Sequence, residues 1–100
     1  MNKLEKMLRG VPVDEIRQVA SQEEQEVTIN ILYGEYGGEV PEIWIYTNSA
    51  TVMKRILRKG YIPTDVEYLQ SRPDMPFSME FKLPISELGQ FVRTGIFQRG

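Results

Sequence analysis

Few residues in this sequence are able to do chemistry, and two of the most versatile types are missing. The 100 residues include neither cysteine nor histidine. Without cysteine there is no thiolate nucleophile, disulfide or zinc–thiolate site, and without histidine the usual general base near neutral pH is lost. Ser-His-Asp and Cys-His catalysis are therefore excluded. We expect a protein that is not an enzyme, has no cofactor, binds no transition metal and does not respond to redox conditions.

Carboxylate chemistry and serine–lysine chemistry remain as alternatives. The acids whose spacing could hold Mg²⁺ are Glu23, Glu24 and Glu26, or Asp65 and Glu67. Ser49 and Lys54 could form a serine–lysine pair, but Ser49 is explained more simply as a helix N-cap. The glycine-rich run 34–38 lacks the Lys-Ser/Thr ending of a phosphate loop and precedes a predicted strand, so we interpret it as a hairpin loop. A carboxylate-dependent or Mg²⁺-dependent enzyme is the third-ranked hypothesis.

A predicted amphipathic helix at residues 49–59 carries four cations on one face. These cations are Lys54, Arg55, Arg58 and Lys59. No acid lies between Asn48 and Thr64, so the helix itself offers the cations no neutralising partner. Such a face could bind phosphates or an acidic protein surface. The alternatives are a solvated face, or pairing within the chain with residues 14–42, which hold eight acids and one base.

An aromatic pair, Trp44 and Tyr46, alternates with Ile43 and Ile45 in a predicted strand at residues 42–47. Successive side chains of a strand point to opposite faces of its sheet. If the isoleucines face the core, the aromatic pair faces outward and could anchor an interface. If both sides of the strand are covered, all four side chains belong to the core.

Apolar periodicity predicts an α+β fold with the order α-α-β-β-α-β-β-α. We expect helices at 2–9, from Val13 to Ala20, at 49–59 and at 85–92, with strands at 27–33, 42–47, 66–70 and 77–83. Turn residues between consecutive strands favour a mainly antiparallel sheet of about four strands, with helices packed on one face. The tail 94–100 is predicted to be loose, with Ile96 and Phe97 as the residues that could pack back onto the core.

The strand at 77–83 and the helix at 49–59 are each apolar on one side only. The strand's apolar residues are Phe77, Met79, Phe81 and Leu83. Those of the helix are Val52, Met53, Ile56 and Leu57. Because each apolar side must be buried against another element, we predict that these two sets face each other.

Length and composition indicate a single domain spanning 1–100. A chain of this size buries one core rather than two. No stretch approaches the ~18 consecutive apolar residues of a membrane span, and charges interrupt the N-terminal residues where a signal peptide would be apolar. The formal net charge is −2. We therefore expect a cytoplasmic protein without membrane contact.

A family resemblance rests on two runs of sequence. The first run is a strand, Ile43-Trp44-Ile45-Tyr46-Thr47-Asn48, followed by a basic helix, Val52-Met53-Lys54-Arg55-Ile56-Leu57-Arg58-Lys59-Gly60. The second is a later alternating strand that ends in Phe81-Lys82-Leu83-Pro84. Over about the C-terminal two-thirds, the chain resembles small uncharacterised proteins of bacteriophages and prophages. The resemblance implies no activity and transfers no functional residue. It does imply an origin in a mobile element, where small proteins often bind and inhibit a host protein.

Three hypotheses follow in order. The first is a non-catalytic small binding module of phage or mobile-element origin that acts by protein–protein contact. The second is a nucleic-acid-associated protein that uses the basic helix, although net acidity opposes general DNA binding. The third is the carboxylate-dependent enzyme. An exposed edge strand could also form a homodimer, since it offers unpaired backbone groups.

Overall fold

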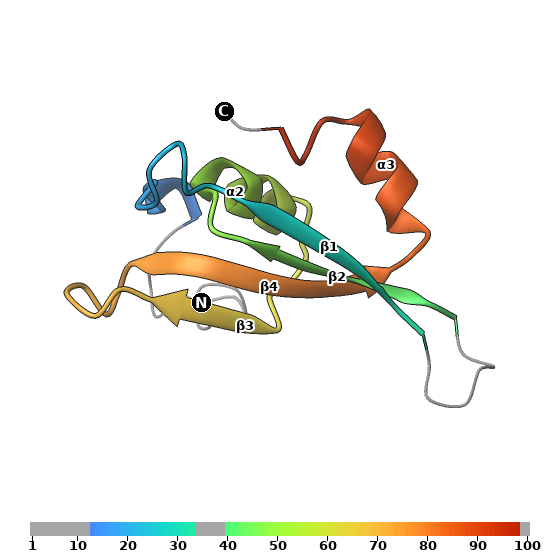
Figure 1. Ribbon diagram of the computed structural model, residues 1–100, viewed down its shortest axis with the longest axis horizontal. Coiled ribbons are helices and arrows are strands. Elements are labelled where there is room, and N and C mark those ends of the chain that lie inside the picture. Colours follow the sequence, from blue (N-terminus) through green and yellow to red (C-terminus); the bar gives the residue numbers. More distant parts are fainter. Residues whose placement is uncertain (1–12, 34–39, 99–100) are drawn as a thin grey trace.

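The computed structural model describes residues 13–33 and 40–98, and it confirms the α+β class (Figure 1). In chain order the elements are η1 (Val13–Glu15), β1 (Val27–Leu32), β2 (Glu42–Thr47), α2 (Ala50–Arg58), β3 (Asp65–Tyr68), β4 (Pro76–Pro84) and α3 (Glu87–Arg93). The helix expected at 2–9 lies outside the described residues.

The four strands form one sheet in the order β1-β2-β4-β3, and every neighbouring pair is antiparallel. The central pair brings Ile45 opposite Phe81 and Ile43 opposite Leu83. On the other side of β2, Ile29 lies opposite Ile45. Directly opposed residues share a face of the sheet, so these positions define its apolar side.

Both helices cover that apolar side, as the predicted architecture required. In Figure 1, α2 and α3 both lie above β2 and β4. The buried cluster joins inward residues of β2 and β4 to the apolar face of α2 and to Phe91 of α3. The apolar residues of β4 and of α2 that were predicted to face each other meet in this cluster, with Phe77 as the exception. Phe77 is half-buried near the β3–β4 turn, and it is not part of this core cluster.

The junction between β2 and α2 is held by buried polar side chains. Ser49 is the N-cap of α2, and its hydroxyl accepts a hydrogen bond from the amide of Val52. The Asn48 side chain accepts from the amide of Glu26 at 2.8 Å and donates to the carbonyl of Glu24 at 3.0 Å. These bonds satisfy buried polar groups and tie the connector before β1 to the start of α2.

Two local predictions need correction. The helix expected from Val13 to Ala20 is only the 3₁₀ turn η1. After this turn the chain is tied to the β2–α2 junction instead, where the Gln18 side-chain amide donates to the carbonyls of Ala20 and Asn48 and accepts from the amide of Ala50. Residues 94–98 are packed rather than loose, in line with the alternative that Ile96 packs back. Ile96 is buried in the core, and its amide donates to the carbonyl of Phe91.

Among residues 13–33 and 40–98, no helix is long and apolar enough to cross a membrane.

Candidate functional site

Arg55 of the basic helix is turned toward the C-terminal segment rather than held free for a ligand. Its guanidinium donates to the backbone carbonyls of Gly95 at 3.0 Å, Ile96 at 3.3 Å and Gln98 at 2.5 Å. A planar guanidinium presents several donors at once, so one side chain can serve several carbonyls. Arg55 therefore acts as a clamp between α2 and the residues that follow α3.

Arg58 also has a partner within the chain. Its guanidinium donates to the Asp14 carboxylate at 2.6 Å, with 55% of the Arg58 side chain and 82% of the Asp14 side chain exposed. This contact, with a smaller contribution from Lys54, lowers the pKa of Asp14 below its usual 3.8. The pair therefore stabilises the fold above that pH and loses its effect as pH falls through the lowered pKa. Solvent screens both groups, so the effect is small.

The basic face is thus not a set of four cations without partners. Lys59 approaches the Phe91 ring, with its ammonium 6.0 Å from the ring centroid. Pairing with the acidic segment, which the sequence left as an alternative, is found for Arg58 and Asp14. Of the readings that the sequence left open, pairing within the chain describes Arg55 and Arg58. Those charges meet groups more than 35 residues away along the chain.

Phe91 also joins two other rings beside the end of α2. The Tyr61 and Phe97 rings meet it edge-on, with centroids 5.6 Å and 5.8 Å away. Burial raises the pKa of Tyr61, and a hydrogen bond and the negative charge of Glu87 raise it further. A raised pKa means that the phenol stays neutral in the folded protein, as a packing role requires.

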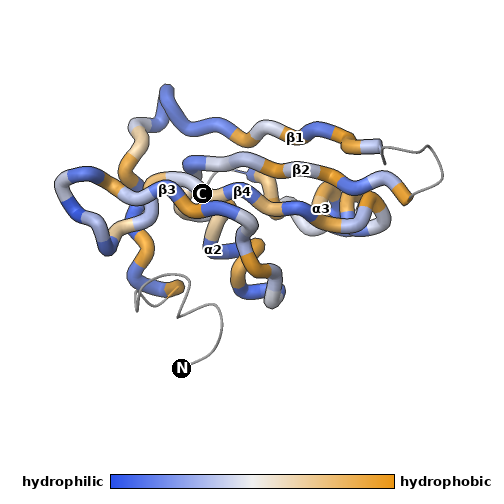
Figure 2. Tube along the Cα trace, turned by 90° about the horizontal axis from the view of Figure 1, so that it is seen from below, coloured by the Kyte–Doolittle hydropathy of each residue, from blue (hydrophilic) through white to orange (hydrophobic). Residues whose placement is uncertain are grey.

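Trp44 and Tyr46 lie on the other face of the sheet from the core. Ile43 and Ile45 are fully buried beneath the helices, so the alternating aromatics point to the opposite side. Both aromatic residues are half-buried. In the part of the chain that the structure describes, all helices belong to the other side, and we call this second side the open face (Figure 2).

Charged residues of three strands surround the aromatic pair on the open face. Tyr46 is opposite Glu80, and Glu80 is in turn opposite Asp65. Trp44 is opposite Lys82. Among strand residues on this face, the acids are Glu42, Asp65, Glu67 and Glu80, and the single base is Lys82. The open face is therefore aromatic at its centre and acidic around it.

The sequence revealed only part of this surface. Alternation alone places Glu80 and Lys82 on the side of β4 opposite Phe81, and Trp44 and Tyr46 on the side of β2 opposite the isoleucines. Which of these side chains become neighbours depends on the strand order. Because β4 inserts between β2 and β3, the acids of β3 lie next to Glu80 rather than next to β2.

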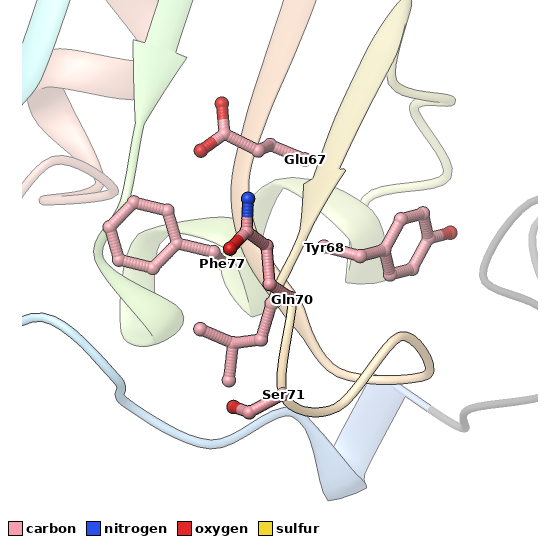
Figure 3. Close-up of a pocket in the computed structure, with 6 residues that line it drawn as sticks. Glu67, Tyr68, Gln70, Ser71 and Phe77 are labelled. Carbon is pink, nitrogen blue, oxygen red and sulfur yellow. The ribbon is translucent and has the colours of Figure 1, made fainter.

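A shallow hollow lies at the turn end of the β3–β4 hairpin (Figure 3). It has a volume of about 470 Å³ and is lined by Glu67, Tyr68, Leu69, Gln70, Ser71 and Phe77. In Figure 3, Phe77 and Tyr68 point to opposite sides of the hairpin. The lining holds one carboxylate, Glu67, and one phenol, Tyr68, and Figure 3 shows these two side chains pointing away from each other. They are therefore not arranged as an acid–base pair.

The other enzymatic alternatives find little geometric support. The Ser49 hydroxyl is buried in its capping role, away from solvent. Within the ranges 13–33 and 40–98, no group of three or more acidic side chains is arranged to hold a metal ion. Comparison with family models, curated proteins and solved structures found no match to this chain.

Proposed function

We propose that this protein is a non-catalytic binding module that holds a partner protein against the open face of its sheet. The observation that carries the proposal is the position of Trp44 and Tyr46, side by side on a sheet face that no helix of residues 13–33 and 40–98 covers. Tryptophan and tyrosine are the residues most enriched at the energetic centres of protein interfaces. A large aromatic side chain also presents a rigid surface at low entropic cost.

The charges around the aromatic pair define the chemistry of the partner. Asp65 and Glu80 are directly opposed across neighbouring strands, and like charges in that position destabilise a sheet. A lysine or arginine from a partner would relieve this repulsion. The same cation could stack on Trp44 or Tyr46. The partner is therefore a protein segment that is basic and partly apolar.

Nucleic-acid binding, the second hypothesis, has weaker support. The open face is acidic and repels phosphate, and two of the four cations of the basic face are engaged by groups of the same chain. For an enzymatic role, the described residues provide neither a base–nucleophile pair nor a cluster of metal ligands. The resemblance to phage and prophage proteins is compatible with a binding module that inhibits a host protein, and that origin stays a prediction.

Charge reversal on the open face tests the proposal. Purified protein should capture a basic partner from nuclease-treated lysate of the producing cell, and Glu67→Lys with Glu80→Lys should abolish the capture. A control with the same charge change away from this face is Glu15→Lys with Glu23→Lys, which should bind like wild type. If both double variants bind equally well, the open face is not the binding surface.

Trp44 provides a direct optical readout, because it is the only tryptophan in the chain. An arginine-rich peptide of about ten residues should shift or quench its fluorescence, and added salt should weaken the effect. A duplex DNA of similar length should leave the emission unchanged. A DNA response with no peptide response would favour the nucleic-acid hypothesis instead.

A further inference from the structure

The two edges of the sheet are built differently. The β3 edge has only four residues, carries Asp65 and Glu67, and shifts register between Glu67 and Tyr68. Short length, charge and irregularity are the usual devices that keep an edge strand from pairing with another chain. The β3 edge is therefore protected.

The β1 edge has none of these protections. Its six residues, Val27–Leu32, pair with β2 in an unbroken register, and the run contains no charged residue and no proline. Figure 2 shows β1 along the outer edge of the sheet. Ile29 and Ile31 lie on the helix-covered side of the sheet but remain 38% and 45% exposed. The helices thus stop short of covering the outermost strand.

We propose that β1 is the contact between two copies of this chain, which pair antiparallel about a two-fold axis perpendicular to the sheet. In such a pair, directly opposed residues share a face, so apolar positions must meet apolar positions. With the axis at Ile29, that residue faces its own copy and Ile31 faces Val27. With the axis at Asn30, Ile29 faces Ile31. In both registers the polar residues Thr28 and Asn30 of each copy lie on the open face.

The absence of charge favours a second copy as the occupant of this edge. A two-fold axis brings the residues next to it close to their own duplicates, so a charged residue at that position repels itself. An edge selected for a different, charged partner could carry complementary charges instead. In a chain with 26% charged residues, β1 is uncharged along its whole length. That composition suits self-pairing.

The paired molecule would have one continuous eight-stranded sheet. Because the axis is perpendicular to the sheet, the helices of both copies lie on one side and both open faces on the other. Two Trp44–Tyr46 pairs would then flank the axis on a single surface, which suits a partner with two basic segments and raises its overall affinity. The dimer itself does not rest on the proposed function, because it forms without any partner.

Sedimentation velocity across a concentration series tests the pairing. Wild-type protein should pass from monomer to dimer as its concentration rises, because a short edge buries little surface and binds weakly. Ile29→Lys and Ile29→Glu should each remain monomeric, and their far-UV circular dichroism should show a retained fold. Val92→Lys, at an apolar residue of α3 that is 63% exposed, is the control and should dimerise like wild type.

Mixing the two charged variants makes the test specific for β1. In either register, the residue-29 side chains of the two copies lie on the same face of the sheet, next to the axis. They are directly opposed when the axis is at Ile29, and they are diagonal neighbours when the axis is at Asn30. An equal mixture of the Lys and Glu variants should therefore recover the dimer. The proposal is overturned if the wild-type protein stays monomeric at every concentration, or if both charged variants still dimerise. It is also overturned if the mixture does not recover the dimer, or if Val92→Lys is monomeric. Ile31→Lys provides a second test of the same edge should position 29 prove unable to accept charge.

Discussion

Among single residues, Phe81 and Phe91 are the largest fully buried side chains, and Phe81 lies within the sheet. Its side chain has no solvent exposure and lies opposite Ile45 at the centre of the sheet. Phe81→Ala should lower the free energy of unfolding by about 3–5 kcal/mol, because the surrounding side chains cannot collapse fully into the space left behind. Urea unfolding followed by circular dichroism measures this change.

Phe77→Ala is the matched control, since it deletes the same atoms from the same strand. Phe77 is half-buried outside the core, so its loss should cost clearly less. Equal losses at the two positions would show that β4 is not packed as described. The comparison therefore separates a core position of β4 from a position outside the core cluster, a distinction that periodicity leaves open.

Between elements, Arg55 is the contact that holds the C-terminal segment to α2. Hydrogen bonds to charged groups are stronger than neutral ones, so Arg55→Ala should destabilise the protein by about 1–2 kcal/mol. Amide hydrogen exchange should also accelerate at residues 95–98, because the guanidinium binds the carbonyls of Gly95, Ile96 and Gln98. Mass spectrometry of the C-terminal peptides measures this local effect.

Arg58→Ala supplies the comparison for Arg55, because it removes the same charge from the same helix. Its partner Asp14 is exposed, so we expect little change in stability and none in C-terminal exchange. If Arg58→Ala loosened the C-terminal segment as much as Arg55→Ala, the effect would come from helix charge rather than from the carbonyl contacts.

Taken as a whole, the molecule has one core that links all of its major elements. Ile16, the strands β2 and β4, both helices and Ile96 share a single buried cluster. Unfolding should therefore be cooperative, with Trp44 emission and far-UV circular dichroism giving coincident urea transitions at dilute protein. Two separated transitions would contradict the single domain that length and composition predict.

The sequence by itself determined the types of the elements and the side that each one buries. Residues 42–47 form the predicted strand, and the isoleucines there face the core, because alternation and apolar periodicity are local properties of the backbone. The α2 helix follows from Ser49 as N-cap and from its one apolar face. These features depend on neighbours within a few residues.

Only the tertiary structure decided which distant groups meet. The strand order β1-β2-β4-β3 places Asp65 beside Glu80 and leaves β1 at an edge, and the packing of the tail brings its carbonyls to Arg55. Residues 13–20 match a helical pattern, yet Gln18 binds the carbonyls of Ala20 and Asn48 there. Contacts between residues tens of positions apart cannot be predicted from local periodicity, because they depend on how helices and strands pack and not on the residues' secondary-structure propensities.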